Sequence, residues 1–182
     1  MRSLNHRHNI KVGEPPQFIN GQGLAPIRSY RLGLFNMAYC GCPAIAIYNA
    51  QRLCGKKPDL FRIGALVEVY ALTLFGVFGA SPWRLKWVLG RLGMENETVK
   101  DVDSFWRALD GNIAILCYKT GLKWNSTWHF VAIDGRERPM LIYNRYNDLD
   151  RPSPINNIDE LITPKQFITA YVFKDGSALQ EA

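Results

Sequence analysis

Residues 43–54 form a segment so apolar that a helix built from it must be buried on nearly all sides. The letters PAIAIYNAQRLC place apolar side chains at most positions, and Gly55 follows as a stop signal. A helix that has almost no polar face is stable only inside a protein. The rest of the chain must therefore pack around this helix.

Three further helices are predicted downstream of this segment. Asp59 is placed to cap a second helix that runs to about Phe75, and Ser81–Pro82 is typical of the start of a third helix that ends at Gly93. A short fourth helix is predicted over 102–109. Helices therefore dominate the first part of the chain.

The second half changes to short apolar runs that favour strands. These runs cover 112–118, 128–134, 140–143 and 170–173, and Asp134–Gly135 predicts the turn of a hairpin. Helices followed by an antiparallel sheet indicate an α+β fold. We expect a helical subdomain packed on a C-terminal antiparallel sheet.

Cys42 is the first candidate for chemistry, because it comes directly before the apolar helix. Pro43 is tolerated in the first turn of a helix, where its missing N–H costs nothing, and Gly41 allows a sharp turn. A helix N-terminus lowers the pKa of a thiol and so favours the nucleophilic thiolate. The sequence therefore predicts Cys42 as a nucleophile.

His129 and Asn144 complete a candidate Cys–His–Asn triad. His129 opens the apolar run HFVAI, and Asn144 ends the next predicted strand, fifteen residues later, where it could orient the imidazole. Asp148 is an alternative third member, and Asp134 is a weaker one because it points away along the same strand. The sequence predicts that folding brings the three groups into one crevice.

Two positions near Cys42 have other possible roles. Asn36, six residues upstream, could donate its side-chain amide to an oxyanion beside the backbone N–H of Cys42. Cys40 is an alternative nucleophile, but Leu34 stands six residues before it and cannot donate. Cys40 could equally be a buried thiol.

The sequence predicts neither a metal nor a cofactor. Cys40 and Cys42 form a CxC pair that could bind zinc with His6 and His8, but this would require the N-terminal segment to fold onto Cys42. We therefore expect no metal centre.

Composition and charge restrict the kinds of partner that we expect this chain to bind. The net charge is +6, but the 22 Lys and Arg residues are scattered, so we expect a solvated basic surface and no nucleic-acid groove. The apolar run within 63–80 is interrupted by Glu68, and its remainder is shorter than the about 20 residues that cross a bilayer. With no signal peptide visible, the sequence predicts a cytoplasmic protein without a membrane span; it leaves the oligomeric state open.

Together these motifs resemble the papain-like cysteine peptidases, most closely the bacteriocin-leader-processing (double-glycine) peptidases of bacteria. The nucleophile that opens the central helix matches Cys42, the His that opens an apolar strand matches His129, and the Asn or Asp that closes the next strand matches Asn144. The family carries Gln six residues before the nucleophile, where this chain has Asn36. The shorter side chain implies a weaker or differently shaped oxyanion hole.

The resemblance implies a papain-like domain over 35–174. The remaining segments are expected to be an extended N-terminal arm over 1–34, which could occlude a cleft, and a polar tail over 175–182. The active site would lie between the helical subdomain and the sheet. The expected function is a thiol peptidase or amidase, without a cofactor, acting on a peptide-like substrate.

Two other functions remain open. The same Cys–His–Asn machinery could transfer an acyl group to an amine. Alternatively, the departure at Asn36 favours a catalytically inactive binding or immunity-type domain, in which Trp83, Trp87, Trp124 and Trp128 would line a recognition surface.

Overall fold

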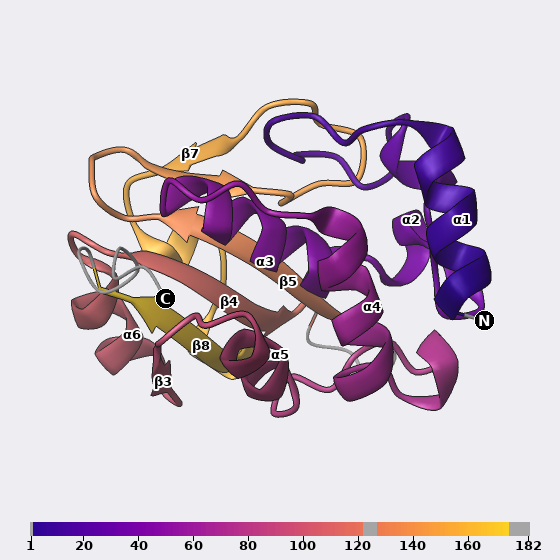
Figure 1. Cartoon of the computed structure of the whole chain (residues 1–182). Helices are drawn as coiled ribbons and strands as arrows, with labels where there is room; N and C mark the ends of the chain where they lie inside the picture. The colour runs from indigo at the N-terminus through magenta and orange to yellow at the C-terminus, as the bar shows by residue number, and fades with distance from the viewer. Residues whose placement is uncertain (1, 122–126, 175–182) are drawn as a thin grey trace.

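A six-stranded antiparallel sheet and a layer of helices organise the computed structural model, which describes residues 2–121 and 127–174 (Figure 1). The strand order is β3-β8-β4-β5-β6-β7, and β1 and β2 form a separate two-stranded ribbon. The strands are β1 (Arg31–Leu32), β2 (Phe35–Asn36), β3 (Glu97–Val99), β4 (Ile113–Lys119), β5 (Trp128–Asp134), β6 (Met140–Tyr143), β7 (Ser153–Ile155) and β8 (Phe167–Phe173). The α-helices are α1 (Arg2–Val12), α2 (Met37–Cys40), α3 (Cys42–Leu53), α4 (Leu60–Tyr70), α5 (Leu85–Arg91) and α6 (Val102–Leu109).

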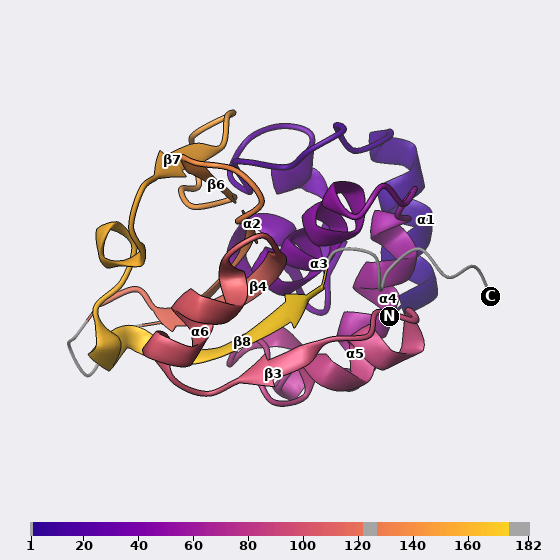
Figure 2. The same cartoon turned by 90° about the vertical axis from the view of Figure 1, so that its left-hand side faces the viewer.

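Both faces of the sheet are covered, each by a different part of the chain. Alternate residues of the central strands, such as Cys117 and Phe130, join the core around α3, whereas Leu116 and Val131 join a second core with Phe105 of α6. The two views show α3 and α6 on opposite sides of the sheet (Figures 1 and 2). Because side chains alternate along a strand, this two-sided burial fixes the register of β4 and β5.

The central helix α3 is buried on nearly all sides, as its composition predicted. Among its twelve residues, Arg52 is the one that is not fully buried. Asn49 lies within this apolar environment, and its carboxamide accepts from the backbone N–H of Ile19 at 2.9 Å and donates to the Ile19 carbonyl at 2.7 Å. These two bonds attach the N-terminal segment to the core.

Most predicted elements are present. The predicted helix over 102–109 and the strands over 128–134 and 140–143 have the expected bounds, and Asp59 caps α4 by accepting from the N–H groups of Phe61 and Arg62. However, α4 ends at Tyr70 instead of Phe75, because the chain turns there into the loop closed by the Leu72–Ala80 bridge. The short edge strands β3 and β7 were not predicted.

The N-terminal segment differs most from expectation. It begins with helix α1 and is not extended there, and α1 packs against α4 and β1. Asn9 fixes this arrangement by bonding both the N–H and the carbonyl of Arg31. Helix α1 is therefore an integral part of the helical layer.

Three sequence-based expectations concern other parts of the chain. The polar tail over 175–182 and Trp124 lie outside the described residues. Within the described ranges, none of the helices combines the length and apolarity needed to cross a bilayer.

Replacing Asn49 tests how strongly the N-terminal segment is attached to α3. We expect Asn49→Ala to lower the free energy of unfolding by about 2–3 kcal/mol, because it leaves the N–H and carbonyl of Ile19 buried without partners. Urea denaturation measures the change. The exposed Asn156→Ala is the matched control and should change stability by less than about 0.5 kcal/mol; equal effects would contradict the anchoring role.

Candidate functional site

The first turn of α3 places Cys42 at the end of the helical layer that faces the sheet. Gly41 is the N-cap, Cys42 is the first helical residue, and Pro43 follows within the first turn. A Cβ at Gly41 would overlap the carbonyl oxygen of Met37, so glycine allows α2 to pass directly into α3. The Cys-Gly-Cys sequence thus sets the position of the thiol.

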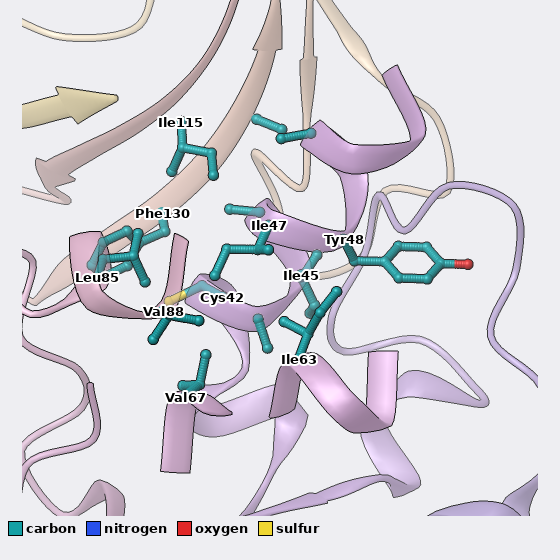
Figure 3. Close-up of a cluster of buried hydrophobic side chains, with 14 of the residues drawn as sticks. Cys42, Ile45, Ile47, Tyr48, Ile63, Val67, Leu85, Val88, Ile115 and Phe130 are labelled. Carbon is teal, nitrogen blue, oxygen red and sulfur yellow. The ribbon is translucent and has the colours of Figure 1, made fainter. Parts of the chain in front are cut away.

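The Cys42 thiol lies against the backbone of β5. It interacts with the backbone N–H of Phe130, the residue that follows His129, and with its own N–H. Figure 3 shows its sulfur directed toward the side of the core where Leu85, Val88 and Phe130 lie. Only 8% of the residue is exposed.

This burial determines the protonation state of Cys42. Loss of solvation in the apolar surroundings raises the thiol's pKa to about 11, and it outweighs the two backbone N–H groups, which lower it. The thiol is therefore protonated near neutral pH. The thiolate that the position at a helix N-terminus favours is therefore scarce at that pH.

His129 is held in one orientation and one tautomer. Its Nε2 lies 2.7 Å from the backbone carbonyl oxygen of Asn144, and its ring packs edge-on against Tyr118. A carbonyl can only accept, so Nε2 carries the proton and Nδ1 is the ring's acceptor. Burial lowers the pKa of His129 below its usual value, although the bond to Asn144 opposes this.

Asn144 contacts the imidazole through its backbone and not through its side chain. Its carboxamide is buried and forms a reciprocal pair with Gln22: it accepts from the Gln22 backbone N–H and donates to the Gln22 side-chain oxygen, both at 3.1 Å. Asn144 also adopts a left-handed backbone conformation with φ of 63°, which Asn tolerates better than most residues. The structure thus places Asn144 beside His129, with the backbone carbonyl and not the side chain in contact.

Gln22 is a residue of this site that the sequence analysis missed. Besides pairing with Asn144, its Nε2 donates to the carbonyl of Ala38 in α2 at 2.8 Å. It therefore links the end of β6 to the helical layer beside Cys42. The available signal was local: glycines flank Gln22, and a Cβ at Gly21 or Gly23 would press on the backbone oxygen of Asn147.

Asn36 is not placed where an oxyanion donor would be needed. Its side chain caps α2 by accepting from the N–H of Tyr39 at 3.1 Å, and it borders a separate surface depression with His8 and Arg28. The six-residue spacing to Cys42 spans the short helix α2, and the side-chain oxygen of Asn36 caps that helix. The backbone N–H of Cys42 retains its expected position at the helix N-terminus.

The two alternative residues also lie in specific environments. The Cys40 thiol donates to the carbonyl of Leu32 at 3.4 Å, and burial raises its pKa to about 12. Asp148 is exposed, in the turn after β6. These placements make Cys42 a better candidate nucleophile than Cys40. They also make the backbone carbonyl of Asn144, and not Asp148, the partner of His129.

A cleft of about 940 Å³ opens beside these groups. Cys42 and His129 both line it, together with Gln22 and Cys40. Aromatic side chains also line it: Tyr118 is buried, whereas Tyr39, Phe78, Trp128 and Tyr146 are exposed. The cleft is large enough to accept an extended segment of several residues.

No cluster of three or more potential metal ligands occurs in residues 2–121 and 127–174. His8, one of the two histidines of the zinc alternative, lies 3.0 Å from the carbonyl of Ser29 through its Nε2. The structure therefore does not assemble a CxC and histidine site.

Comparison with solved structures places this arrangement among known folds. The peptidase domain of Streptococcus ComA, a bi-functional ABC transporter involved in a quorum-sensing pathway, superimposes with a TM-score of 0.52 and covers 79% of this chain and 96% of that domain. The chain has the α+β fold of papain-like peptidase domains. Sequence identity is 9%, so the likeness concerns the fold alone. No protein-family model and no curated protein matches the sequence.

The protonation state of Cys42 can be measured by alkylation. We expect the rate of its reaction with iodoacetamide to rise about tenfold per pH unit from about pH 7 to about pH 10, because the thiolate is scarce below a pKa of about 11. Mass spectrometry of the Cys42 peptide follows the rate, and the peptide with the more accessible Cys54 is followed in the same samples. A rate that is already maximal at neutral pH would contradict a Cys42 thiol that is protonated there.

Proposed function

We propose that this chain is a cysteine peptidase or amidase that cleaves a peptide-like substrate in the cleft. The observation that carries the proposal is the convergence of a helix-terminal thiol, a histidine of defined tautomer and a helix N-terminus on one cleft. The fold shared with a peptidase domain supports it. Cys42 is the proposed nucleophile, and His129 is the proposed acid and base.

The protonation states favour a general-base mechanism. Nδ1 of His129 would take the proton from the Cys42 thiol as sulfur attacks the scissile carbonyl carbon, and the resulting imidazolium would then donate that proton to the leaving amine. The thioester left on Cys42 would be hydrolysed by water that His129 deprotonates. The backbone N–H of Cys42, with the helix N-terminus behind it, would stabilise the oxyanion.

Asn144 would orient His129 through its backbone carbonyl, and Gln22 would hold Asn144. A neutral carbonyl fixes the tautomer but stabilises an imidazolium less than a carboxylate does. Gln22 is thus a positioning residue, and it acts through the two hydrogen bonds of its reciprocal pair with Asn144.

The buried, neutral thiol also favours a second candidate function. A cleft with aromatic walls and a thiol whose pKa is about 11 fits a binding domain that captures peptides without cleaving them. Turnover separates the two candidates, because binding alone leaves the peptides intact. An acyltransferase differs from the peptidase in the group that releases the thioester.

Activity should depend on Cys42 and His129 and not on other thiols. We expect the wild type to cleave members of a proteome-derived peptide library, read by mass spectrometry, and Cys42→Ala or His129→Ala to lower the rate by at least about 10³-fold. Cys54→Ala is the matched control and should be unaffected. Peptide binding with no cleavage by the wild type would favour the binding domain, and release of the acyl group to added amines would favour the transferase.

The positioning role of Gln22 predicts a specific kinetic change. We expect Gln22→Ala to lower kcat roughly 10- to 100-fold with KM nearly unchanged, because Asn144 keeps its bond to the backbone N–H of residue 22 but loses the side-chain bond, so that the carbonyl that orients His129 is held less firmly, and small misplacements of a catalytic group are costly. Gln17→Ala, an exposed change in the same segment, should leave kcat unchanged. Equal loss in both variants, or a loss confined to KM, would contradict the assignment.

A further inference from the structure

Large apolar side chains are exposed along one side of the molecule, beside the cleft. Within the loop that follows α4, the exposed fractions are 62% for Leu74, 61% for Phe75 and 69% for Phe78. Trp83, just before α5, and Trp87, on α5, are about as exposed, at 60% and 61%. A concentration of exposed aromatic residues of this kind marks an interaction surface.

The loop presents these side chains at a conformational cost. Leu74 and Phe75 both have positive φ, 46° and 56°, a region that bulky residues rarely adopt. Backbone hydrogen bonds hold the loop in this shape. The N–H of Thr73 donates to the carbonyl of Gly79 at 2.9 Å, and the N–H of Leu34 donates to the carbonyl of Phe75 at 3.0 Å. Strain that the surrounding structure maintains at exposed apolar residues favours a role for those residues in binding.

The side chain of Trp128 connects the exposed residues of the loop with those at and before α5. Its ring packs edge-on against Trp83 at 5.5 Å, and it lines the same cleft as Phe78. The loop and α5 lie along the lower edge of the molecule in Figure 1, and α5 keeps that place in Figure 2. We call this surface the Trp–Phe face, and it comprises Leu74, Phe75, Phe78, Trp83, Trp87 and Trp128.

Charge distinguishes the possible occupants of this face. Arg84, Lys86 and Arg91 are exposed among its tryptophans, and the sequence from residue 69 to residue 94 contains no Asp or Glu. Tryptophan gathers at the boundary between hydrocarbon and headgroups, where its ring is apolar and its N–H is wet. Basic residues near that boundary are attracted to anionic headgroups.

We propose that the Trp–Phe face docks on the surface of an anionic lipid bilayer. The loop's Leu and Phe side chains enter the headgroup region together with Trp83 and Trp87, and Arg84, Lys86 and Arg91 contact lipid phosphates. Docking places the cleft at the membrane surface, because Phe78 and Trp128 line the cleft and also belong to the Trp–Phe face. The proposal concerns binding alone and holds whether or not the cleft is catalytic.

A soluble peptide is the competing occupant, and the charge pattern favours lipid over it. An apolar peptide segment would need only the aromatic residues for binding. Residues 69–94 also carry three cations and no acidic residue, and this pattern matches a uniformly anionic surface. Lipid binding also predicts a dependence on salt and on headgroup charge. These two dependences form the basis of the test.

Vesicle co-sedimentation of the full chain tests the proposal. We expect binding to vesicles of phosphatidylcholine with phosphatidylglycerol, weaker binding to pure phosphatidylcholine, and loss of binding at high salt. Trp fluorescence should shift to shorter wavelength when anionic vesicles are added. Trp87→Ser with Phe78→Ser, and separately Arg84→Glu with Lys86→Glu, should each weaken binding by at least roughly tenfold.

Matched changes on α1 provide the control. Ile10 is 56% exposed and Lys11 is also exposed. Ile10→Ser with Lys11→Glu therefore removes one exposed apolar and one exposed basic side chain from a different surface, and it should leave vesicle binding unchanged. Circular dichroism checks that every variant is folded. Absence of vesicle binding, equal loss in the control, or binding of an apolar peptide in place of vesicles would overturn the proposal.

Discussion

The backbone of β5 at residues 129 and 130 is the constraint on which the candidate site depends. His129 projects its ring toward the carbonyl of Asn144, while the N–H of the next residue, Phe130, meets the Cys42 thiol. Both contacts require one register of β5 against β4, and that register is enforced by the apolar cores on the two faces of the sheet. A slip of one residue would exchange the two faces and separate the thiol from the histidine.

The packing that positions Cys42 also suppresses its ionisation. The close contact of α3 with the sheet removes water from the thiol and raises its pKa, while the backbone N–H groups of Phe130 and Cys42 act in the opposite direction and are weaker. The same desolvation keeps His129 neutral. A neutral thiol and a neutral imidazole suit proton transfer during attack, and they also explain why a binding domain is the nearest competing interpretation.

The sequence predicted those parts of the structure that short-range patterns determine. The apolar character of 43–54 predicted a buried central helix, and the short apolar run over 128–134 predicted the strand that carries His129. Asn36 shows the limit: its spacing from Cys42 suggested an oxyanion donor, but Asn is also an effective helix cap, and the cap of α2 uses its side chain. Gln22 was missed because its partner, Asn144, is 122 residues away: the glycines that flank Gln22 indicate a close approach of the backbone, but they do not identify the partner.

Reaction with a peptidyl vinyl sulfone tests the central claim most directly, because this electrophile requires an accessible sulfur and a proton donor beside it. The account predicts one adduct per chain, located on Cys42 by peptide mapping, with a rate that falls sharply in His129→Ala. Adducts on Cys54 or Cys40 in place of Cys42, or a Cys42 rate that is indifferent to His129, would contradict it.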